Sequence, residues 1–247
     1  MQVKIFDLGL IDYNKALAFQ TQTHTAVKNE DYPLALIFCQ HNPVITIGRA
    51  GSRQNLVAPP EEVKAKKIQV IESTRGGDIT YHGPGQLTVY PIFSLKYFKK
   101  DIHLFLRYLE ETIMDILCEM GINGVRRPGL TGVWVQDKKI ASIGISIKNW
   151  ISFHGLSINI KKFDLENFNL IRPCGMDIKM TCLEAELGAS MQIKELKDKI
   201  AAKFNNTLPE EPNCEIFPEF NAVFSTASLT TTSINKLGLR RRLPPIL

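Results

Sequence analysis

Residues 75–86 read RGGDITYHGPGQ and concentrate four glycines, a proline, an arginine and a histidine. Glycine lets the backbone adopt positive φ and approach a ligand closely. One interpretation is a binding loop whose amides, together with Tyr81 or His82, line a pocket. The other is a pair of tight turns around the short strand ITY. The stretch is not a P-loop, because no G-K-[ST] follows it and no helix is expected to open after it. The residues alone leave both interpretations open.

A second loop, GRAGS at residues 48–52, follows an expected strand. It offers another place where a backbone could approach closely, but its pattern favours a plain turn. Arg49 in this loop is a candidate for binding an anionic group.

Apolar periodicity outside these loops predicts an α+β domain, with strands in the middle of the chain and helices at its edges. The expected helices are residues 12–28, capped by Asp12, residues 101–120, capped by Asp101 and ended by Gly121, and residues 190–205. The expected strands are residues 34–39, 44–48 and 67–73, a hairpin of 132–136 with 139–147, and 150–160 with a bulge at Gly155. Residues after about 210 indicate a loosely ordered tail.

Composition excludes several classes of protein. The 247 residues allow one or two domains, and 44% hydrophobic with 22% charged residues is ordinary for a globular chain. No apolar run approaches the ~20 residues of a membrane span, and the N-terminal residues show neither a signal nor a transit pattern, so we expect a cytoplasmic protein. The five cysteines contain no CxxC pair, which argues against structural zinc and a disulfide framework. The net charge of +5 comes without a basic stripe, so nucleic acid is not indicated.

Lys139 is a candidate base. Period-two alternation in strand 139–147 places it on one face with Ala141, Ile143, Ile145 and Ile147, so we expect it to point inward. Partial desolvation lowers the pKa of a lysine and makes it a possible base. The alternative is a lysine at a strand end that extends its ammonium to solvent.

Cys174 is a candidate nucleophile, because it lies in a turn between Pro173 and Gly175 within IRPCGM, residues 171–176. A thiolate nucleophile needs access and a nearby cation or base, and the Gly175 N–H can serve as an oxyanion donor. The alternative is an inert loop thiol. His82 and His154 are rival bases to Lys139.

The remaining four cysteines are expected to be structural. Cys39 and Cys118 lie within apolar runs that predict burial. Cys182 and Cys214 have no nearby constellation of polar residues.

Four segments together resemble the lipoyl(octanoyl)transferase family. RGGDITYHGPGQLTVYP is similar to that family's RGG…TYHGPGQL…YP loop, and KKIASIGISI to its KI-[AC]-[SA]-[IL]-G strand. SFHGLSINI resembles its FHG-[FL]-[AS]-x-N-[VI] strand, and IRPCGM its I-x-P-CG turn. NPVITIGR resembles an earlier PPVYTLGR-type segment, with Asn42 and Ile45 as departures. The resemblance runs from about residue 5 to 205, which implies a catalytic domain at 1–208 and a partly irregular C-terminal extension at 209–247.

The resemblance implies an acyltransferase with the mixed sheet and flanking helices shared by biotin and lipoate protein ligases. Cys174 then receives an octanoyl group from acyl carrier protein as a thioester and passes it to a lipoyl-domain lysine. Lys139 lowers the thiol pKa and relays protons. The acceptors are lipoyl domains of 2-oxoacid dehydrogenases and the glycine cleavage H protein, and no ATP, metal or other cofactor is required. The segments matching the family's acyl pocket comprise Arg75, Gly76, Gly77, Asp78, Ile79, Thr80, Tyr81, His82, Ser142, Ile143, Gly144, Gly155, Leu156 and Ser157.

Three alternatives remain. An ATP-dependent lipoate–protein ligase of the same fold would not need Cys174, and such ligases resemble RR-x-[ST]-GGG-A-V-[FY]-H-D in the glycine-rich loop. An amidotransferase between lipoyl domains would also use the cysteine. A non-catalytic acyl-binding module would need neither Cys174 nor Lys139.

Overall fold

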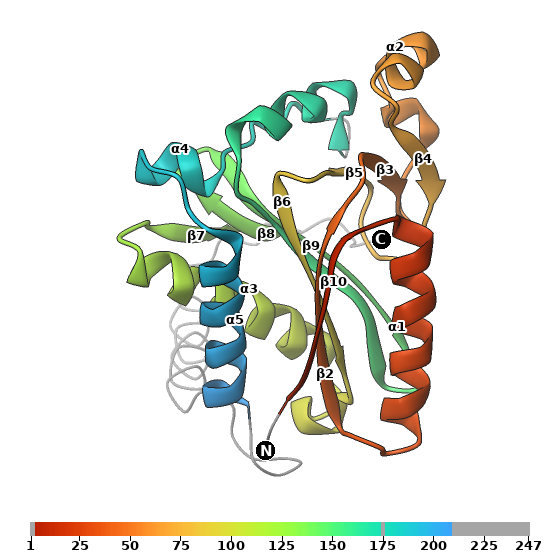
Figure 1. Cartoon of the computed structure of the whole chain (residues 1–247), viewed down its shortest axis with the longest axis vertical. Coiled ribbons are helices and arrows are strands. Elements are labelled where there is room, and N and C mark those ends of the chain that lie inside the picture. The colour runs from red at the N-terminus through yellow and green to blue at the C-terminus, as the bar shows by residue number, and fades with distance from the viewer. Residues whose placement is uncertain (1–2, 174–175, 209–247) are drawn as a thin grey trace, which may run out of the picture. The chain divides into compact units, whose positions relative to one another are not determined.

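The computed structural model describes residues 3–173 and 176–208, which belong to one compact unit spanning 1–213. The extension predicted at 209–247 lies outside the described residues. Within the unit, a large mixed sheet runs between helices on its two sides (Figure 1). The predicted α+β class with a mixed sheet and flanking helices is therefore confirmed.

The large sheet has seven strands in the order β1-β2-β6-β10-β9-β8-β7. Strands β1 and β2 pair in parallel, and the other neighbours are antiparallel. Their bounds are β1 (Lys4–Ile11), β2 (Leu34–His41), β6 (Gln86–Phe93), β7 (Gly124–Arg127), β8 (Leu130–Val135), β9 (Lys138–Lys148) and β10 (Ile151–Asn159).

A second, three-stranded sheet has the order β4-β3-β5. Strand β3 (Val44–Ile47) lies parallel to β4 (Gln69–Glu72) and antiparallel to β5 (Ile79–His82). The short strand expected within the glycine-rich stretch is β5. Strands β2 and β3 are separated by only two residues, yet they belong to different sheets.

The helices follow the local signals of the sequence. Helix α1 (Tyr13–Lys28) begins after Asp12, whose carboxylate accepts from the N–H groups of Asn14 at 2.9 Å and Lys15 at 3.2 Å. Asp101 caps α3 (Ile102–Glu119) in the same way, and Gly121 follows with φ +75°. The other helices are α2 (Pro60–Ala65), α4 (Leu183–Leu187) and α5 (Ile193–Thr207), with 3-10 turns at Arg53–Asn55, Leu95–Phe98 and Lys162–Leu170.

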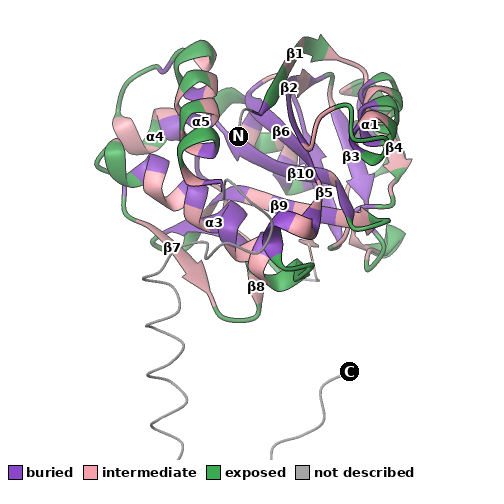
Figure 2. Ribbon diagram, turned by 90° about the horizontal axis from the view of Figure 1, so that it is seen from below, coloured by how far each residue is buried: buried purple, intermediate pink, exposed green. Residues whose placement is uncertain are grey.

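Both faces of the large sheet are buried in its centre. Figure 2 shows β2, β6 and β10 largely buried, whereas α1 is exposed along its outer side. Helix α1 packs apolar side chains such as Ala16 and Val27 against Ile37 and Ile92. Helices α3 and α5 cover the opposite face through a cluster of rings: Phe93, Phe98, Phe105, Tyr108 and Phe204.

Two local predictions are wrong. Strand β10 pairs with β9 in one register from Ile151 to Ile158, so there is no bulge at Gly155. The irregularity there is His154, which has φ +57°, and both faces of β10 are covered, so side chains of either phase are buried. Cys118 is exposed, because it lies on the side of α3 that faces away from the sheet; Cys39 and Cys182 are buried, and Cys214 lies outside the described residues.

Among residues 3–173 and 176–208, no helix combines the length and apolar composition needed to cross a membrane.

Candidate active site

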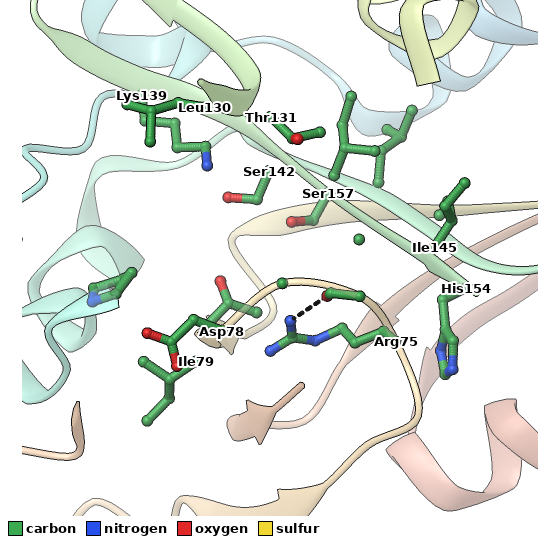
Figure 3. Close-up of a pocket in the computed structure, with 18 of the residues that line it drawn as sticks. Arg75, Asp78, Ile79, Leu130, Thr131, Lys139, Ser142, Ile145, His154 and Ser157 are labelled. Atoms are coloured by element: carbon green, nitrogen blue, oxygen red, sulfur yellow. Dashed lines mark hydrogen bonds between the residues drawn. The ribbon is translucent and has the colours of Figure 1, made fainter. Parts of the chain in front are cut away.

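A pocket of about 410 Å³ lies between the large sheet and the glycine-rich loop. Figure 3 shows Ser142 and Ser157 projecting from the sheet toward Arg75 and Asp78 of the loop. The residues that line it come from six regions of the chain: Tyr13; Arg75–Thr80, His82, Thr88 and Tyr90; Ile102 and Leu106; Gly129, Leu130 and Thr131; Lys139, Ser142–Ile145 and His154–Ser157; and Pro173, Met176, Ile178 and Met180.

The glycine-rich loop packs its backbone directly on strand β9. The Gly76 N–H donates to the Ile145 carbonyl at 2.8 Å. A Cβ on Gly144 would lie 2.8 Å from the Gly76 carbonyl oxygen, and Gly77 has φ +77°. Only glycine tolerates both the approach and the positive φ. Residues 75–86 therefore form a short strand bounded by turns and also line the pocket. The binding-loop and tight-turn interpretations are both correct for this stretch.

Arg75 is buried beneath this loop and ties it to β3. Its Nε donates to Thr46 Oγ1 at 2.9 Å, its Nη2 to the Thr46 carbonyl at 2.5 Å, and its Nη1 to the Gly76 carbonyl at 3.1 Å. Burial lowers the pKa of Arg75, while Tyr13 and Asp78 raise it. The buried guanidinium gives the pocket a positive potential on this side.

The loop at residues 48–52 is a close-approach loop, contrary to the plain turn that its pattern favoured. The Gly48 N–H donates to the Asp78 carbonyl at 3.1 Å, and a Cβ on Gly48 would lie 2.3 Å from the Gly77 carbonyl oxygen. Gly48 thus packs against the backbone of the glycine-rich loop, and this contact helps to hold that loop in its conformation. Arg49 is exposed and does not line the pocket.

Strand β5 presents Tyr81 and His82 to opposite sides. The Tyr81 hydroxyl donates to Asp164 at 2.7 Å, within the apolar cluster of the small sheet, so Tyr81 does not line the pocket as one interpretation expected. Burial, and then Asp164, raises the pKa of Tyr81. His82 does line the pocket. The alternation of a strand is the reason that adjacent residues take these different places.

Both candidate histidine bases have lowered pKa values. Burial lowers the pKa of His82 well below its usual range, with the neighbouring His41 and Arg75 adding to the effect. Burial, and then the charge of Arg75, lowers the pKa of His154 to about 4. Its Nε2 lies 3.0 Å from Thr74 Oγ1. Both imidazoles are therefore neutral near pH 7 and are weak bases.

Lys139 lines the pocket. It does so from a different face of β9 than the one that regular alternation with Ala141 predicted. The register with β8 shifts between the pairs Val133–Ala141 and Trp134–Lys139, which leaves Ile140 as an extra residue in β9. This bulge places Lys139 on the opposite face from Ala141, and so on the face of Ser142. Figure 3 shows the Lys139 ammonium directed toward the pocket beside Ser142.

The lysine side chain runs between a glycine and an aromatic ring. Its Nζ lies 4.7 Å from the centroid of the Trp134 ring. A Cβ on Gly132 would lie 2.6 Å from Lys139 Cε and 3.2 Å from its Nζ, and Gly132 has φ +128°. The Gly132 N–H donates at 3.0 Å to Glu110, a buried carboxylate of α3. Glu110 also accepts from Arg126 at 2.9 Å.

Cys174 and Gly175 lie outside the described residues, so their predicted roles stay predictions. The segment that follows them pairs with the lysine. The Lys139 N–H donates to the Lys179 carbonyl at 2.8 Å, and the Thr181 N–H donates to the Lys139 carbonyl at 3.0 Å. Pro173 and Met176, which flank Cys174 and Gly175 in sequence, both line the pocket.

The structure thus places the predicted substrate-binding residues, with the exception of Tyr81, around one pocket. Sequence reasoning missed Tyr13, Thr88 and Tyr90, which line it as well. Thr88 and Tyr90 are two residues apart in β6, so recognition of that strand and its period would have indicated them. No comparable signal marks Tyr13. Among the described residues, no group of three His, Cys, Asp or Glu side chains is arranged to hold a metal ion.

Comparison with known proteins matches residues 12–205 to the lipoyl protein ligase A/B catalytic domain family. An octanoyltransferase of Thermoanaerobacter sp. (strain X514) is 41% identical over 204 residues, which cover 82% of this chain and 88% of the relative. An octanoyltransferase of Geobacter metallireducens is 38% identical over 207 residues, covering 83% and 93%.

Solved structures share the fold at low sequence identity. Lipoate-protein ligase A bound with ATP has a TM-score of 0.68 at 15% identity, over 87% of this chain and 90% of that one. Biotin protein ligase from Aquifex aeolicus, in complex with biotin and ATP, has a TM-score of 0.50 at 14% identity, over 82% and 69%. The fold is therefore of the biotin and lipoate protein ligase type.

Proposed function

We propose an octanoyl transfer for this chain, which belongs to the lipoyl protein ligase A/B catalytic domain family and, within it, to the octanoyltransferases. It is accordingly an acyltransferase. The proposed donor is octanoyl-acyl carrier protein, and the proposed acceptor is the lysine of a lipoyl domain, in 2-oxoacid dehydrogenases and the glycine cleavage H protein. We expect the reaction in the cytoplasm. The net charge of +5 suits acidic partners by electrostatic steering.

The proposed nucleophile is Cys174. Its thiolate attacks the thioester carbonyl of the donor, the phosphopantetheine thiol departs with a proton, and an octanoyl-cysteine thioester remains. The ε-amine of the acceptor lysine then attacks this thioester. An amide forms, the amine loses a proton, and the Cys174 thiol is regenerated.

Lys139 is the proposed activating group. An ammonium near a thiol lowers the thiol pKa, and it can pass a proton to the departing phosphopantetheine sulfur. The observation that supports this assignment is that Lys139 lines the pocket together with Pro173 and Met176, which flank the Cys174 turn in sequence. The low pKa values of His82 and His154 disfavour the histidines as bases.

The proposed energetics require neither ATP nor a metal. The first step exchanges one thioester for another and is nearly isoenergetic, whereas the second converts a thioester into an amide and runs downhill. This separates the proposal from an adenylate-forming ligase, whose reaction would depend on ATP.

Intact-mass spectrometry after incubation with octanoyl-acyl carrier protein tests the donor and the nucleophile. We expect one octanoyl increment on the wild-type chain, none on Cys174→Ala, and loss of the increment when a lipoyl domain is added. Persistence of the increment in Cys174→Ala would show that the nucleophile is wrong. Dependence of product on ATP would favour the ligase instead.

The Lys139→Ala variant tests the activating group separately. It should retain its thermal unfolding midpoint within a few degrees and lose most of the transfer rate. Normal turnover in this variant would exclude the Cys–Lys pair and return attention to His82 and His154.

A further inference from the structure

Trp134 on β8 is a buried aromatic residue beside the proposed activating group. It pairs directly with Lys139 of β9, and the side chains of directly paired residues lie on the same face of a sheet. The Lys139 Nζ lies over the indole ring, 4.7 Å from its centroid, which is within the range of a cation–π interaction. Trp134 is 1% exposed and does not line the pocket, so any effect on the reaction has to pass through a neighbour such as Lys139.

The neighbouring strand on the other side holds the Trp134 ring in place. Val125 of β7 pairs directly with Trp134. The Arg127 guanidinium lies 6.0 Å from the ring centroid, and its Nη2 donates to the Gln136 carbonyl at 3.0 Å. The indole is therefore a fixed surface against which the Lys139 side chain can pack.

The backbone of Lys139 is fixed on the side away from β8 as well, whereas its side chain is a flexible four-carbon stem. The Lys139 N–H donates to the Lys179 carbonyl at 2.8 Å, and its carbonyl accepts from the Thr181 N–H at 3.0 Å. A catalytic group that is displaced by about 1 Å loses roughly 100-fold in rate. Contact with the Trp134 ring restricts the stem, and the missing side chain of Gly132 leaves room for it.

The indole also acts on the charge of Lys139. The π face of a tryptophan attracts an ammonium and not a neutral amine, so it favours the protonated form. A carboxylate would favour that form too, but it would neutralise the charge, whereas a ring leaves the charge available to a thiolate. Acids on the adjoining segments are engaged by other cations: Glu110 accepts from Arg126 at 2.9 Å, and Asp137 lies 3.5 Å from Lys179.

We propose that Trp134 is a positioning residue that holds the Lys139 ammonium at the pocket. The inference rests on the proposed octanoyl transfer, in which that ammonium stabilises the thiolate and passes a proton to the departing sulfur. Loss of the attraction lets the stem leave its productive position, so the chemical step slows. Donor binding depends on other pocket residues and should change little.

Fluorinated tryptophans test this role without removing the side chain. Fluorine atoms withdraw electron density from the π face and weaken its attraction for a cation, while they add little volume. The chain has two tryptophans, and Trp150 is 45% exposed in the turn between β9 and β10, so a Trp150→Phe background confines the substitution to Trp134. We expect kcat for transfer to a lipoyl domain to fall stepwise with the number of fluorine atoms, by roughly tenfold over the series, and KM to stay within about twofold.

Nuclear magnetic resonance tests the contact itself. Protons over an indole face are shifted upfield by the ring current, so the ε-methylene signal of Lys139 should be shifted in the wild-type chain. Loss of the signal in Lys139→Arg assigns it, which is necessary because Lys96 and Lys100 also lie near aromatic rings. The signal should return to the ordinary position in Trp134→Leu. An unshifted Lys139 signal in the wild-type chain would refute the contact.

The outcomes separate the two proposals. If the wild-type chain transfers octanoyl groups but kcat does not respond to fluorination, the role of Trp134 is refuted and the proposed function stands. A larger loss of kcat in folded Trp134→Phe than in Trp134→Leu also refutes it, because phenylalanine keeps a π face and leucine does not. If these two variants do not fold, the fluorinated chains decide, because they keep the shape of the side chain. If the wild-type chain transfers no octanoyl group from any thioester donor, the proposed function fails, and the inference fails with it.

Discussion

Gly132→Ala is the substitution that most directly tests the placement of Lys139. The added Cβ would lie 2.5 Å from the Ala141 carbonyl oxygen and 2.6 Å from Lys139 Cε. The carbonyl belongs to the β-sheet backbone and cannot move cheaply, whereas the lysine side chain can. The alanine is therefore expected to push the ammonium away from its position beside Trp134.

The expected magnitudes differ for stability and for activity. A φ of +128° is a backbone conformation that side-chain-bearing residues rarely adopt and costs about 1–3 kcal/mol. The contact with the Ala141 carbonyl brings the total loss to about 2–4 kcal/mol of unfolding free energy. Displacement of a catalytic group by about 1 Å costs roughly 100-fold in rate. Gly132→Ala should therefore lose most of its transfer activity while a folded population remains.

Gly121→Ala is the matched control. Gly121 also has positive φ, +75°, but nothing lies within 4 Å of the Cβ position, and the residue ends α3 away from the pocket. It should lose about 1–2 kcal/mol and keep wild-type transfer. Urea unfolding gives the stabilities, and octanoyl transfer to a lipoyl domain at a temperature where both variants are folded gives the rates. Transfer by folded Gly132→Ala within twofold of Gly121→Ala would refute the reasoning.

Three further predictions concern stability. Glu110→Ala should lower the free energy of unfolding by about 2–4 kcal/mol, because it leaves Arg107, Arg126 and the Gly132 N–H without their buried acceptor. Glu110→Gln should lose less, because its amide oxygen can still accept from that N–H. Equal losses of the two variants in urea melts would contradict this. Gly155→Ala should yield little folded protein, as judged by circular dichroism, because its Cβ would lie 2.2 Å from the Val89 carbonyl oxygen; a wild-type melt would contradict it. Three buried histidines have folded-state pKa values below their unfolded value near 6.5: His41, His82 and His154. The unfolded chain therefore binds more protons than the folded chain below that pH. The free energy of unfolding should fall by about 1.4 kcal/mol per histidine per pH unit as the pH drops from about 6.5 toward 4. Urea melts at pH 7 and 5 measure this slope, and replacement of His154 by Asn should make it shallower.

Elements with strong local signals are predicted well from the sequence. Helices α1 and α3 combine an aspartate cap with regular apolar spacing, and both begin within one residue of the predicted start. The hairpin of β8 and β9 is also predicted, because two alternating runs flank a short polar turn. These features depend on residues within one turn or one strand of each other, which is information that a single sequence contains.

Strands β1 and β6 are not predicted. Strand β1 contains Gly9 with φ +60° and a register shift, which interrupts its alternation. Strand β6 is buried throughout and contains Pro91, a residue that argues against a central strand because it lacks an N–H donor. Tertiary packing on both faces of β6 overrides that local preference.

The sequence by itself determined which groups are candidates to carry chemistry: the Cys174 thiol, a lysine at a strand end and a loop whose glycines tolerate close contact. Only the tertiary structure decided how the lysine and the loop are arranged. Lys139 reaches the pocket through a bulge that shifts β9 by one residue, and Tyr81 turns away to Asp164. The physical reason is that strand alternation fixes relative faces only within an unbroken register, whereas bulges and partner strands, which are distant in sequence, decide which face meets the pocket.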